Sequence, residues 1–182
     1  MAMTIISSVF RAGEVIPTKY SCEGANVSPP VQWDGVPAAA RSLALICDDP
    51  DAPMGTWVHW LLYNLPTSVS NLPEHVPASE MLSSGAKQGM NDFKRIGYGG
   101  PCPPPEKTHR YYFKLYALDV ELALKPRATK QNYCARWKVT SWLKHNSWAR
   151  TSVRSELSWL AVDTRMNSHK RTQRSQRIFR VE

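Results

Sequence analysis

The sequence predicts an all-β fold, a sandwich of short strands with short peripheral helices. Short runs of β-branched, aromatic and aliphatic residues recur from about residue 4 to residue 119. Clusters of Pro, Gly, Asn and Asp separate these runs, and the prolines lie in the connections. A parallel α/β sheet would need helical crossovers between strands, so a sandwich is favoured. The 182 residues suffice for one buried core and are few for two.

Five strands are predicted in this part of the chain, at residues 4–10, 31–33, 42–48, 58–65 and 110–118. In the last of these runs, apolar and polar positions alternate imperfectly. Such a pattern is typical of a strand with one buried face and one partly covered face. Residues 125–131 predict the start of a helix.

The composition changes near residue 131, so we predict a β-sandwich domain at 1–130 and an atypical segment at 131–182. The net charge is +8, but residues 1–130 carry equal numbers of basic and acidic side chains. The whole basic excess therefore lies in the second segment. This segment has no clean helix or strand period, and we expect it to be partly disordered. It also holds four of the seven tryptophans, namely Trp137, Trp142, Trp148 and Trp159.

Charge and cysteine content restrict the function classes. Because the basic excess is confined to the tail, the domain itself is not expected to bind nucleic acid. We predict no transmembrane segment and a cytoplasmic location, because no long apolar run and no signal-peptide pattern occur. The cysteines lie far apart without a Cys-x-x-Cys pair, which favours buried or semi-buried thiols over a disulfide scaffold. They are Cys22, Cys47, Cys102 and Cys134.

Polar side chains gather in two segments at predicted loop edges. In residues 48–60 a strand ends in acidic residues, and the next strand begins with a histidine between tryptophans. In residues 97–111 a loop rich in Gly and Pro leads into a strand that begins with a histidine. Glycine lets the backbone approach a ligand closely, and proline fixes a loop before binding. These two segments therefore predict a binding site.

Six segments resemble the prokaryotic branch of the phosphatidylethanolamine-binding, or Raf-kinase-inhibitor-like, protein family. They are SPPVQW (28–33), DDPDAP (48–53), HWLLYNLP (59–66), NDF (91–93), GYGGPCPP (97–104) and HRY (109–111), in the family's order. The resemblance implies a Greek-key sandwich with a pocket for phosphate, carboxylate or a phospholipid headgroup. Carried over position by position, it implies these ligand-binding residues: Asp49, Asp51, Trp57, His59, Gly100, Pro101, His109 and Tyr111.

The residue types in this set fit an anion site. Imidazole and phenol groups donate hydrogen bonds to a phosphate without a lysine. The carboxylates can fix the imidazole tautomers, raise the histidine pKa values and bind a headgroup ammonium. Weak binding is therefore expected at high pH. Taken without the resemblance, Asp49 and Asp51 fit turn formers and His59 fits a half-buried core histidine. Arg110 is predicted to form a structural ion pair.

The predicted function is non-enzymatic binding of a small anionic ligand, with no cofactor and no metal. A Gly-x-Ser-x-Gly nucleophile motif is absent from the sequence, as is a His-x-x-x-His or cysteine-rich metal spacing. The resemblance also implies an alternative, an inhibitor of a kinase or a serine protease, and it suggests a homodimer. Nucleic-acid binding would depend on the basic tail being a genuine product.

The tail itself is predicted to arise from a shifted reading frame. If one base was lost before codon 133, codons 133–153 permit the string LLRAMEGHILAEAQLMGTYKR, and codon 154 permits a stop. This string has a helical period and resembles the family's ending. The printed residues, in contrast, conflict with local pattern along their whole length. The alternative is a genuine divergent tail.

Overall fold

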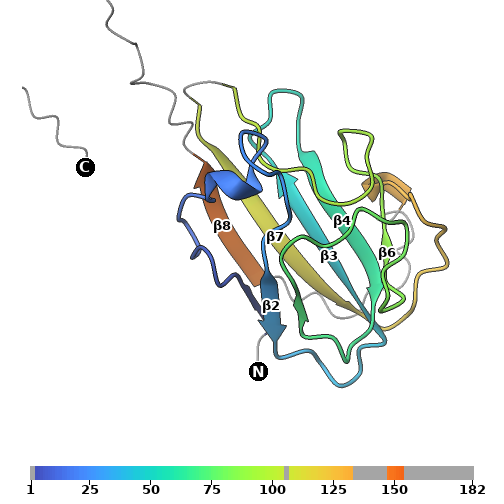
Figure 1. The fold of residues 1–182 in the computed structure, drawn as a ribbon. Helices are drawn as coiled ribbons and strands as arrows, with labels where there is room; N and C mark the ends of the chain where they lie inside the picture. The colour runs from blue at the N-terminus through green and yellow to red at the C-terminus, as the bar shows by residue number, and fades with distance from the viewer. Residues whose placement is uncertain (1–2, 105–106, 133–146, 154–182) are drawn as a thin grey trace, which may run out of the picture.

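Two antiparallel sheets form a β-sandwich (Figure 1). The computed structural model describes residues 3–104, 107–132 and 147–153, the last range for its backbone. The smaller sheet has the order β1 (Thr4–Ile6), β2 (Val31–Asp34), β5 (Asn71–Leu72). The larger sheet has the order β6 (Lys87–Gln88), β4 (Trp57–Leu65), β3 (Ser42–Asp49), β7 (His109–Leu118), β8 (Ser147–Val153). A 3-10 helix, η1, spans Thr18–Tyr20. The predicted fold class is confirmed.

The long strands agree with their predicted ranges to within one residue at most ends. The first strand is the exception, because it ends at Ile6 rather than at residue 10. All of β3 is buried, and β7 alternates between buried and less buried positions as its sequence predicts. Strands β5 and β6 were not predicted, since two residues are too few to show a period.

The core occupies both faces of the larger sheet. Between the sheets, Trp33, Trp60 and Phe113 belong to one buried cluster that also includes the inward residues of β3. On the opposite face, Ile46 and Tyr63 belong to a second cluster, against which partly buried hydrophobic residues of the 116–128 segment pack. Strand β3 is therefore covered on both sides, which explains its unbroken apolar run.

A break in strand register changes the direction of side chains on β4. Cys47 is paired with Trp60, while the next β3 residue, Asp48, is paired with Val58, so His59 is the extra residue on β4. Such a bulge lets two consecutive side chains lie on the same side of a sheet. Trp60 belongs to the inner core and His59 lines a cavity at the same end of the sandwich. Strict alternation would have placed only one of them there.

The described part of the C-terminal segment adds one strand to the larger sheet. Strand β8 pairs with β7 from Ser147 opposite Leu115 to Val153 opposite His109, so the sheet continues past the predicted boundary at residue 130. A helix begins at residue 130, as predicted, and Thr129 and Asn132 cap it by reciprocal hydrogen bonds. The predicted disorder and tryptophan-rich stretch fall mainly on residues 133–146 and 154–182, which lie outside the described residues.

The prediction of thiols rather than disulfides was wrong for two cysteines. Cys22 and Cys102 form a disulfide across a sequence separation of 80 residues, with their Cα atoms 5.4 Å apart. Sequence spacing misled here, because residues far apart in the chain can meet at one loop cluster. Cys47 is a buried free thiol, as expected, and Cys134 lies outside the described residues. No helix in the described ranges is long and apolar enough to cross a membrane.

Candidate functional site

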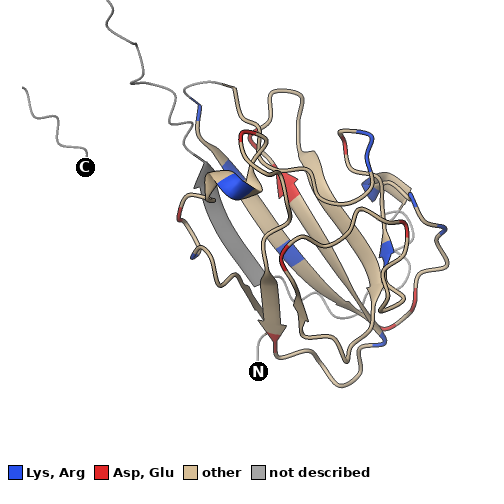
Figure 2. Cartoon of the chain, in the orientation of Figure 1, with Lys and Arg blue, Asp and Glu red and all other residues tan. Residues whose placement is uncertain are grey.

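A cavity of about 370 Å³ opens at one end of the larger sheet. It lies where β3 ends and where β4 and β7 begin, and Figure 2 shows this end of β3 in red because acidic residues occupy it. Its lining combines a buried polar set with an apolar rim. The lining residues are Asp49, Ala52, Pro53, Met54, Trp57, His59, Phe93, Cys102, Pro104, His109 and Tyr111.

Strand pairing brings the polar residues together. Asp49 is paired with Trp57 of β4, and on the other side of β3 the preceding residue, Asp48, is paired with Tyr112 of β7. Because side chains alternate along a strand, His109 and Tyr111 share one face of β7. Three adjacent strands thus supply the polar part of one cavity, and the two predicted loop segments do converge.

A buried carboxylate orients one of the two histidines. Asp49 Oδ2 lies 2.7 Å from His109 Nδ1, and both side chains are almost fully buried. The other oxygen, Oδ1, accepts a hydrogen bond of 2.8 Å from the Asp51 backbone N–H. Asp49 therefore both closes its own turn and fixes His109, so the turn-former and site interpretations hold together. With Nδ1–H bonded to the carboxylate, only Nε2 of His109 can serve a ligand.

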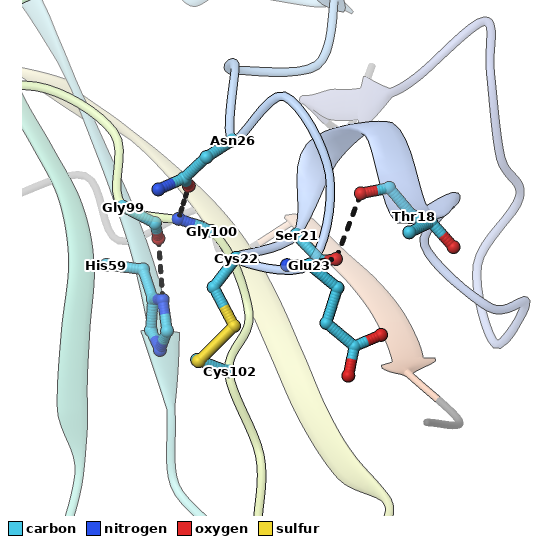
Figure 3. The surroundings of a disulfide bond; sticks show 9 residues. All are labelled: Thr18, Ser21, Cys22, Glu23, Asn26, His59, Gly99, Gly100 and Cys102. Atoms are coloured by element: carbon cyan, nitrogen blue, oxygen red, sulfur yellow. Dashed lines mark hydrogen bonds between the residues drawn. A yellow bond between two sulfur atoms is a disulfide. The ribbon is translucent and has the colours of Figure 1, made fainter. Parts of the chain in front are cut away.

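A backbone carbonyl orients the second histidine. His59 Nδ1 lies 2.7 Å from Gly99 O (Figure 3). Gly99 N–H donates in return to His59 O at 2.8 Å. Because a carbonyl only accepts, Nδ1 carries the ring proton and Nε2 is the free nitrogen. Asn91 supports the same loop, because its Nδ2 donates to Gly97 O at 3.1 Å and its Oδ1 accepts from Arg95 N–H at 3.0 Å.

Two further polar atoms of the cavity lack partners. Among the described residues, neither Trp57 Nε1 nor the Tyr111 hydroxyl has a hydrogen-bond partner, although both atoms are buried. Buried donors are normally paired with protein or water. The rings around them are packed edge to face, with His59 lying 5.1 Å from Tyr111 and 5.2 Å from Phe93 between centroids. The cavity thus holds fixed, unpaired donors beside two oriented imidazoles.

Burial dominates the electrostatics of this site. It lowers the pKa of His59 below the ordinary value of 6.5, although the Gly99 carbonyl and the Asp49 carboxylate act in the opposite direction. The sequence-based expectation of a raised histidine pKa is therefore wrong for His59, because desolvation outweighs the nearby carboxylates. Burial first, and the Asp49 charge second, raise the pKa of Tyr111, so its phenol stays a neutral donor.

Three of the predicted site residues do not line the cavity. Asp51 accepts from Arg110 Nε at 2.8 Å and from the Arg110 backbone N–H at 2.9 Å, and this guanidinium lowers the pKa of Asp51 to about 2. The predicted structural ion pair of Arg110 is thereby confirmed. Gly100 N–H donates to Asn26 Oδ1 at 2.7 Å, and Pro101 O accepts from Cys22 N–H at 3.0 Å. Gly100 and Pro101 thus hold their loop against the segment from Cys22 to Asn26.

Sequence reasoning missed several lining residues, most of them apolar. Phe93 lay within the quoted NDF segment, and Ala52, Pro53, Cys102 and Pro104 lay within the two loop segments, but apolar side chains carried no signal for a site. Met54 is 91% exposed, the largest fraction among the exposed large hydrophobic residues of the described chain. Its position after Pro53 gave no hint that it faces a cavity.

The described residues hold no group of three or more His, Cys, Asp and Glu side chains arranged for a metal ion. Asp48, although it adjoins Asp49, lies on the opposite face of β3. It is fully buried there, and its carboxylate meets Lys114 Nζ at 2.6 Å and Lys130 Nζ at 2.7 Å. The acidic cluster in the sequence is thus divided between the cavity and a structural ion triad.

Fold and cavity together define a class: antiparallel β-sandwich proteins with an Asp/His/Tyr cavity at one end of the larger sheet. The family model described as phosphatidylethanolamine-binding protein matches residues 6–156. The chain belongs to the phosphatidylethanolamine-binding protein family.

Similar proteins occur in archaea and bacteria. The chain is 50% identical over 130 residues to a UPF0098 protein of Methanothermobacter thermautotrophicus, covering 71% of this chain and 85% of that protein. A UPF0098 protein of Aquifex aeolicus is 48% identical over 132 residues, with 71% and 77% covered.

Two solved structures share the fold. One is a phosphatidylethanolamine-binding protein homologue from Chlamydia trachomatis, with a TM-score of 0.76, 39% identity, and coverage of 85% of this chain and 99% of that chain. The other is E. coli YbcL, described as a member of the mammalian PEBP family, with a TM-score of 0.75, 31% identity and the same coverage.

Proposed function

We propose that this chain binds a small anionic ligand in the Asp49–His109 cavity without turning it over. The ligand class is a phosphate, a carboxylate or a phospholipid headgroup. The observation that carries the proposal is the pair of oriented imidazoles. Each ring has its Nδ1 held by a fixed acceptor, so each offers Nε2 alone, beside the unpaired donors of Trp57 and Tyr111.

The shape of the cavity supports a ligand with a small polar head group and an apolar body. Its polar residues are almost fully buried, whereas the rim includes the exposed Met54 together with Pro53 and Pro104. A ligand that reaches the unpaired donors must leave water, and it regains hydrogen bonds only if it carries acceptors. An anionic head supplies acceptors, and an apolar body matches the rim.

A neutral imidazole in this arrangement accepts a proton rather than donating one. Anion binding therefore requires either protonation of a ring or a ligand that brings its own acidic proton, such as a phosphate monoanion. Asp49 Oδ2 lies 2.7 Å from His109 Nδ1 and so fixes the orientation in which His109 offers Nε2.

Titration with inorganic phosphate tests the proposal. The variant His109→Asn keeps a donor near the Nδ1 position for Asp49 but lacks Nε2, and His59→Asn does the same toward Gly99 O. We expect each variant to bind phosphate about tenfold or more weakly, the loss of a charge-assisted hydrogen bond of about 1.5–3 kcal/mol. Isothermal titration calorimetry at pH 6 measures this.

The matched control is His75→Asn. His75 is exposed, lies outside the cavity and has a φ of 59°, a conformation that asparagine tolerates. The control is expected to bind phosphate like the parent. Equal affinity in all four proteins, or no binding by the parent, contradicts the proposal.

The alternative function, inhibition of a kinase or a serine protease, stays a prediction, as do the homodimer and the cytoplasmic location. Size-exclusion chromatography with light scattering measures the oligomeric state, and cell fractionation measures the location. Inhibition assays that compare the parent with His109→Asn would show whether any inhibitory activity depends on the same cavity.

A further inference from the structure

We propose that the Cys22–Cys102 disulfide is an exchangeable redox switch in the cavity wall, opened by dithiols. The inference rests on the proposed function, since it concerns the same cavity. Cys102 lines the cavity, and Cys22 belongs to the loop that follows η1. Figure 3 shows the disulfide joining this N-terminal loop to the Gly99–Cys102 stretch that orients His59.

The disulfide joins two exposed residues. Both Cys22 and Cys102 are exposed residues, although they adjoin the buried Ser21 and Pro101. Thiol–disulfide exchange requires a thiolate to reach a sulfur along the S–S axis, so access is a condition for reaction. Exposed disulfides are in general the labile and regulatory ones, whereas structural disulfides are shielded.

The two loops remain joined without the disulfide. Cys22 N–H donates to Pro101 O, Gly100 N–H donates to Asn26 Oδ1 at 2.7 Å, and the Tyr98 hydroxyl donates to Tyr20 O at 2.8 Å. None of these bonds involves a sulfur atom. The loops can therefore stay together on reduction while the Gly99–Cys102 stretch, no longer tied by a covalent bond, gains freedom, which is a condition for a reversible switch.

Greater mobility of the Gly99–Cys102 stretch would reach the site through His59. Gly99 lies three residues before Cys102, and its carbonyl and amide bond to the Nδ1 and the backbone oxygen of His59. A looser loop holds the imidazole less firmly and widens the wall that Cys102 forms. We expect anion affinity to fall on reduction, because an ordered site has already met part of the entropic cost of binding.

The exchange balances with a dithiol as the reductant. One thiolate of the dithiol attacks one sulfur of the cystine, the S–S bond breaks, and a mixed disulfide and a protein thiolate result. The second thiol of the dithiol then closes on the mixed disulfide and releases the second cysteine thiolate. Two electrons pass from the dithiol, which becomes a cyclic disulfide, and both cysteine thiolates take up protons.

The experiment compares oxidised and reduced full-length protein under native conditions. Dithiothreitol is added, thiols are alkylated, and mass spectrometry assigns the labelled cysteines, while near-ultraviolet circular dichroism monitors the fold. We expect Cys22 and Cys102 to be labelled with the fold intact, and the phosphate dissociation constant to rise about tenfold, equivalent to about 1.4 kcal/mol. Reoxidation should restore the affinity.

Variants separate this inference from the proposed function. The double variant Cys22→Ser/Cys102→Ser should bind phosphate like the reduced protein, and dithiothreitol should not change its phosphate affinity. The phosphate affinity of His75→Asn should respond to dithiothreitol like that of the parent. If the oxidised parent binds no phosphate, the proposed function fails. If it binds phosphate equally in both redox states, or if labelling requires denaturant, the switch fails while the proposed function stands.

Discussion

At the scale of residues, the cavity depends on which ring nitrogen carries the proton. Asp49 is hydrogen-bonded to Nδ1 of His109, and the Gly99 carbonyl is hydrogen-bonded to Nδ1 of His59. Both rings therefore present the same nitrogen, Nε2, to a ligand. The two rings differ in their partners, because one has a carboxylate and the other a neutral carbonyl. Burial lowers the pKa of His59, so this ring contributes most to anion binding at low pH.

This arrangement predicts a pH dependence of anion affinity. Sulfate is a suitable probe, because its charge stays constant between pH 5 and pH 8. Since the pKa of His59 lies below 6.5, its ring is mostly neutral at pH 7 and takes up a proton on anion binding. We expect sulfate affinity to rise as pH falls below about 6.5, by up to about tenfold per pH unit for each proton taken up. Calorimetric titrations over this range measure it, and a flat profile would contradict it.

The same histidine predicts an opposite trend for the stability of the free protein. The folded pKa of His59 is lowered, so the unfolded chain binds a proton first as pH falls through about 6.5. The free energy of unfolding should therefore decrease below this pH, by at most about 1.4 kcal/mol per pH unit from this group. Urea unfolding of the parent and of His59→Asn measures the difference, and the variant should show a smaller decrease.

Sequence reasoning at this scale identified residue types but not their surroundings. It selected Asp49, Trp57, His59, His109 and Tyr111, all of which line the cavity. It could not weigh burial against charge, so it predicted the wrong direction for the pKa of His59. Asp51 has the same local pattern as Asp49, and only the position of Arg110 directs it away from the cavity.

At the scale of elements, the site depends on a register break and a tightly packed loop. The bulge on β4 puts His59 on the cavity side without removing Trp60 from the core. The loop from Gly97 to Pro104 closes the wall. Glycine is required at position 100, because a Cβ there would lie 2.4 Å from the Tyr20 carbonyl oxygen and 2.9 Å from Ser21 Cα.

This close approach predicts the effect of Gly100→Ala. Two of the three contacting atoms belong to backbone and the third is Asn26 Oδ1, the acceptor of the Gly100 N–H, so the loop must shift. We expect a loss of about 1–3 kcal/mol in stability, as for other overpacked sites, and weaker phosphate binding through the displaced Gly99 carbonyl. Thermal unfolding and titration measure both effects. Gly13→Ala is the contrast for phosphate binding only: a Cβ at Gly13 would meet nothing within 4 Å, whereas its φ of 83° makes alanine cost stability there as well. Equal behaviour of the two variants in phosphate binding would contradict the role of Gly100.

The strand pattern was predictable because long strands carry a period. Strands β3, β4 and β7 each span at least eight residues and were predicted within one residue of their bounds. The bulge was not predictable, since it depends on how β4 aligns with β3. The disulfide was also missed, because its two cysteines lie in separate loops that meet only after the sandwich forms.

At the scale of the whole molecule, the C-terminal segment is the departure from the family pattern. Its described part, β8, lies at the edge of the larger sheet, and position 151 is paired with Tyr111 of the cavity. The alternative reading frame places a tyrosine at this position, and its preceding letters have a helical period. The strand paired with the cavity residue Tyr111 thus belongs to the segment for which a shifted reading frame is predicted.

This position predicts the effect of restoring the other frame. Residues 133–182 are replaced by LLRAMEGHILAEAQLMGTYKR, which supplies an apolar helix face for packing and removes most of the basic excess. We expect the melting temperature to rise by about 5 °C or more, equivalent to roughly 2 kcal/mol. Differential scanning calorimetry measures it. A chain ending at residue 132 is the control, since it removes the tail without adding a helix, and an equal rise in both would contradict the prediction.

The sequence by itself determined the fold class, the long strands and the two loop segments that supply the site, because these depend on local period, turn residues and ordered motifs. Only the tertiary structure decided which acidic residue holds an imidazole, which way the bulge turns His59 and which cysteines meet. These outcomes depend on the distance between residues far apart in the chain and on the exclusion of water around them. Neither quantity is encoded in local pattern.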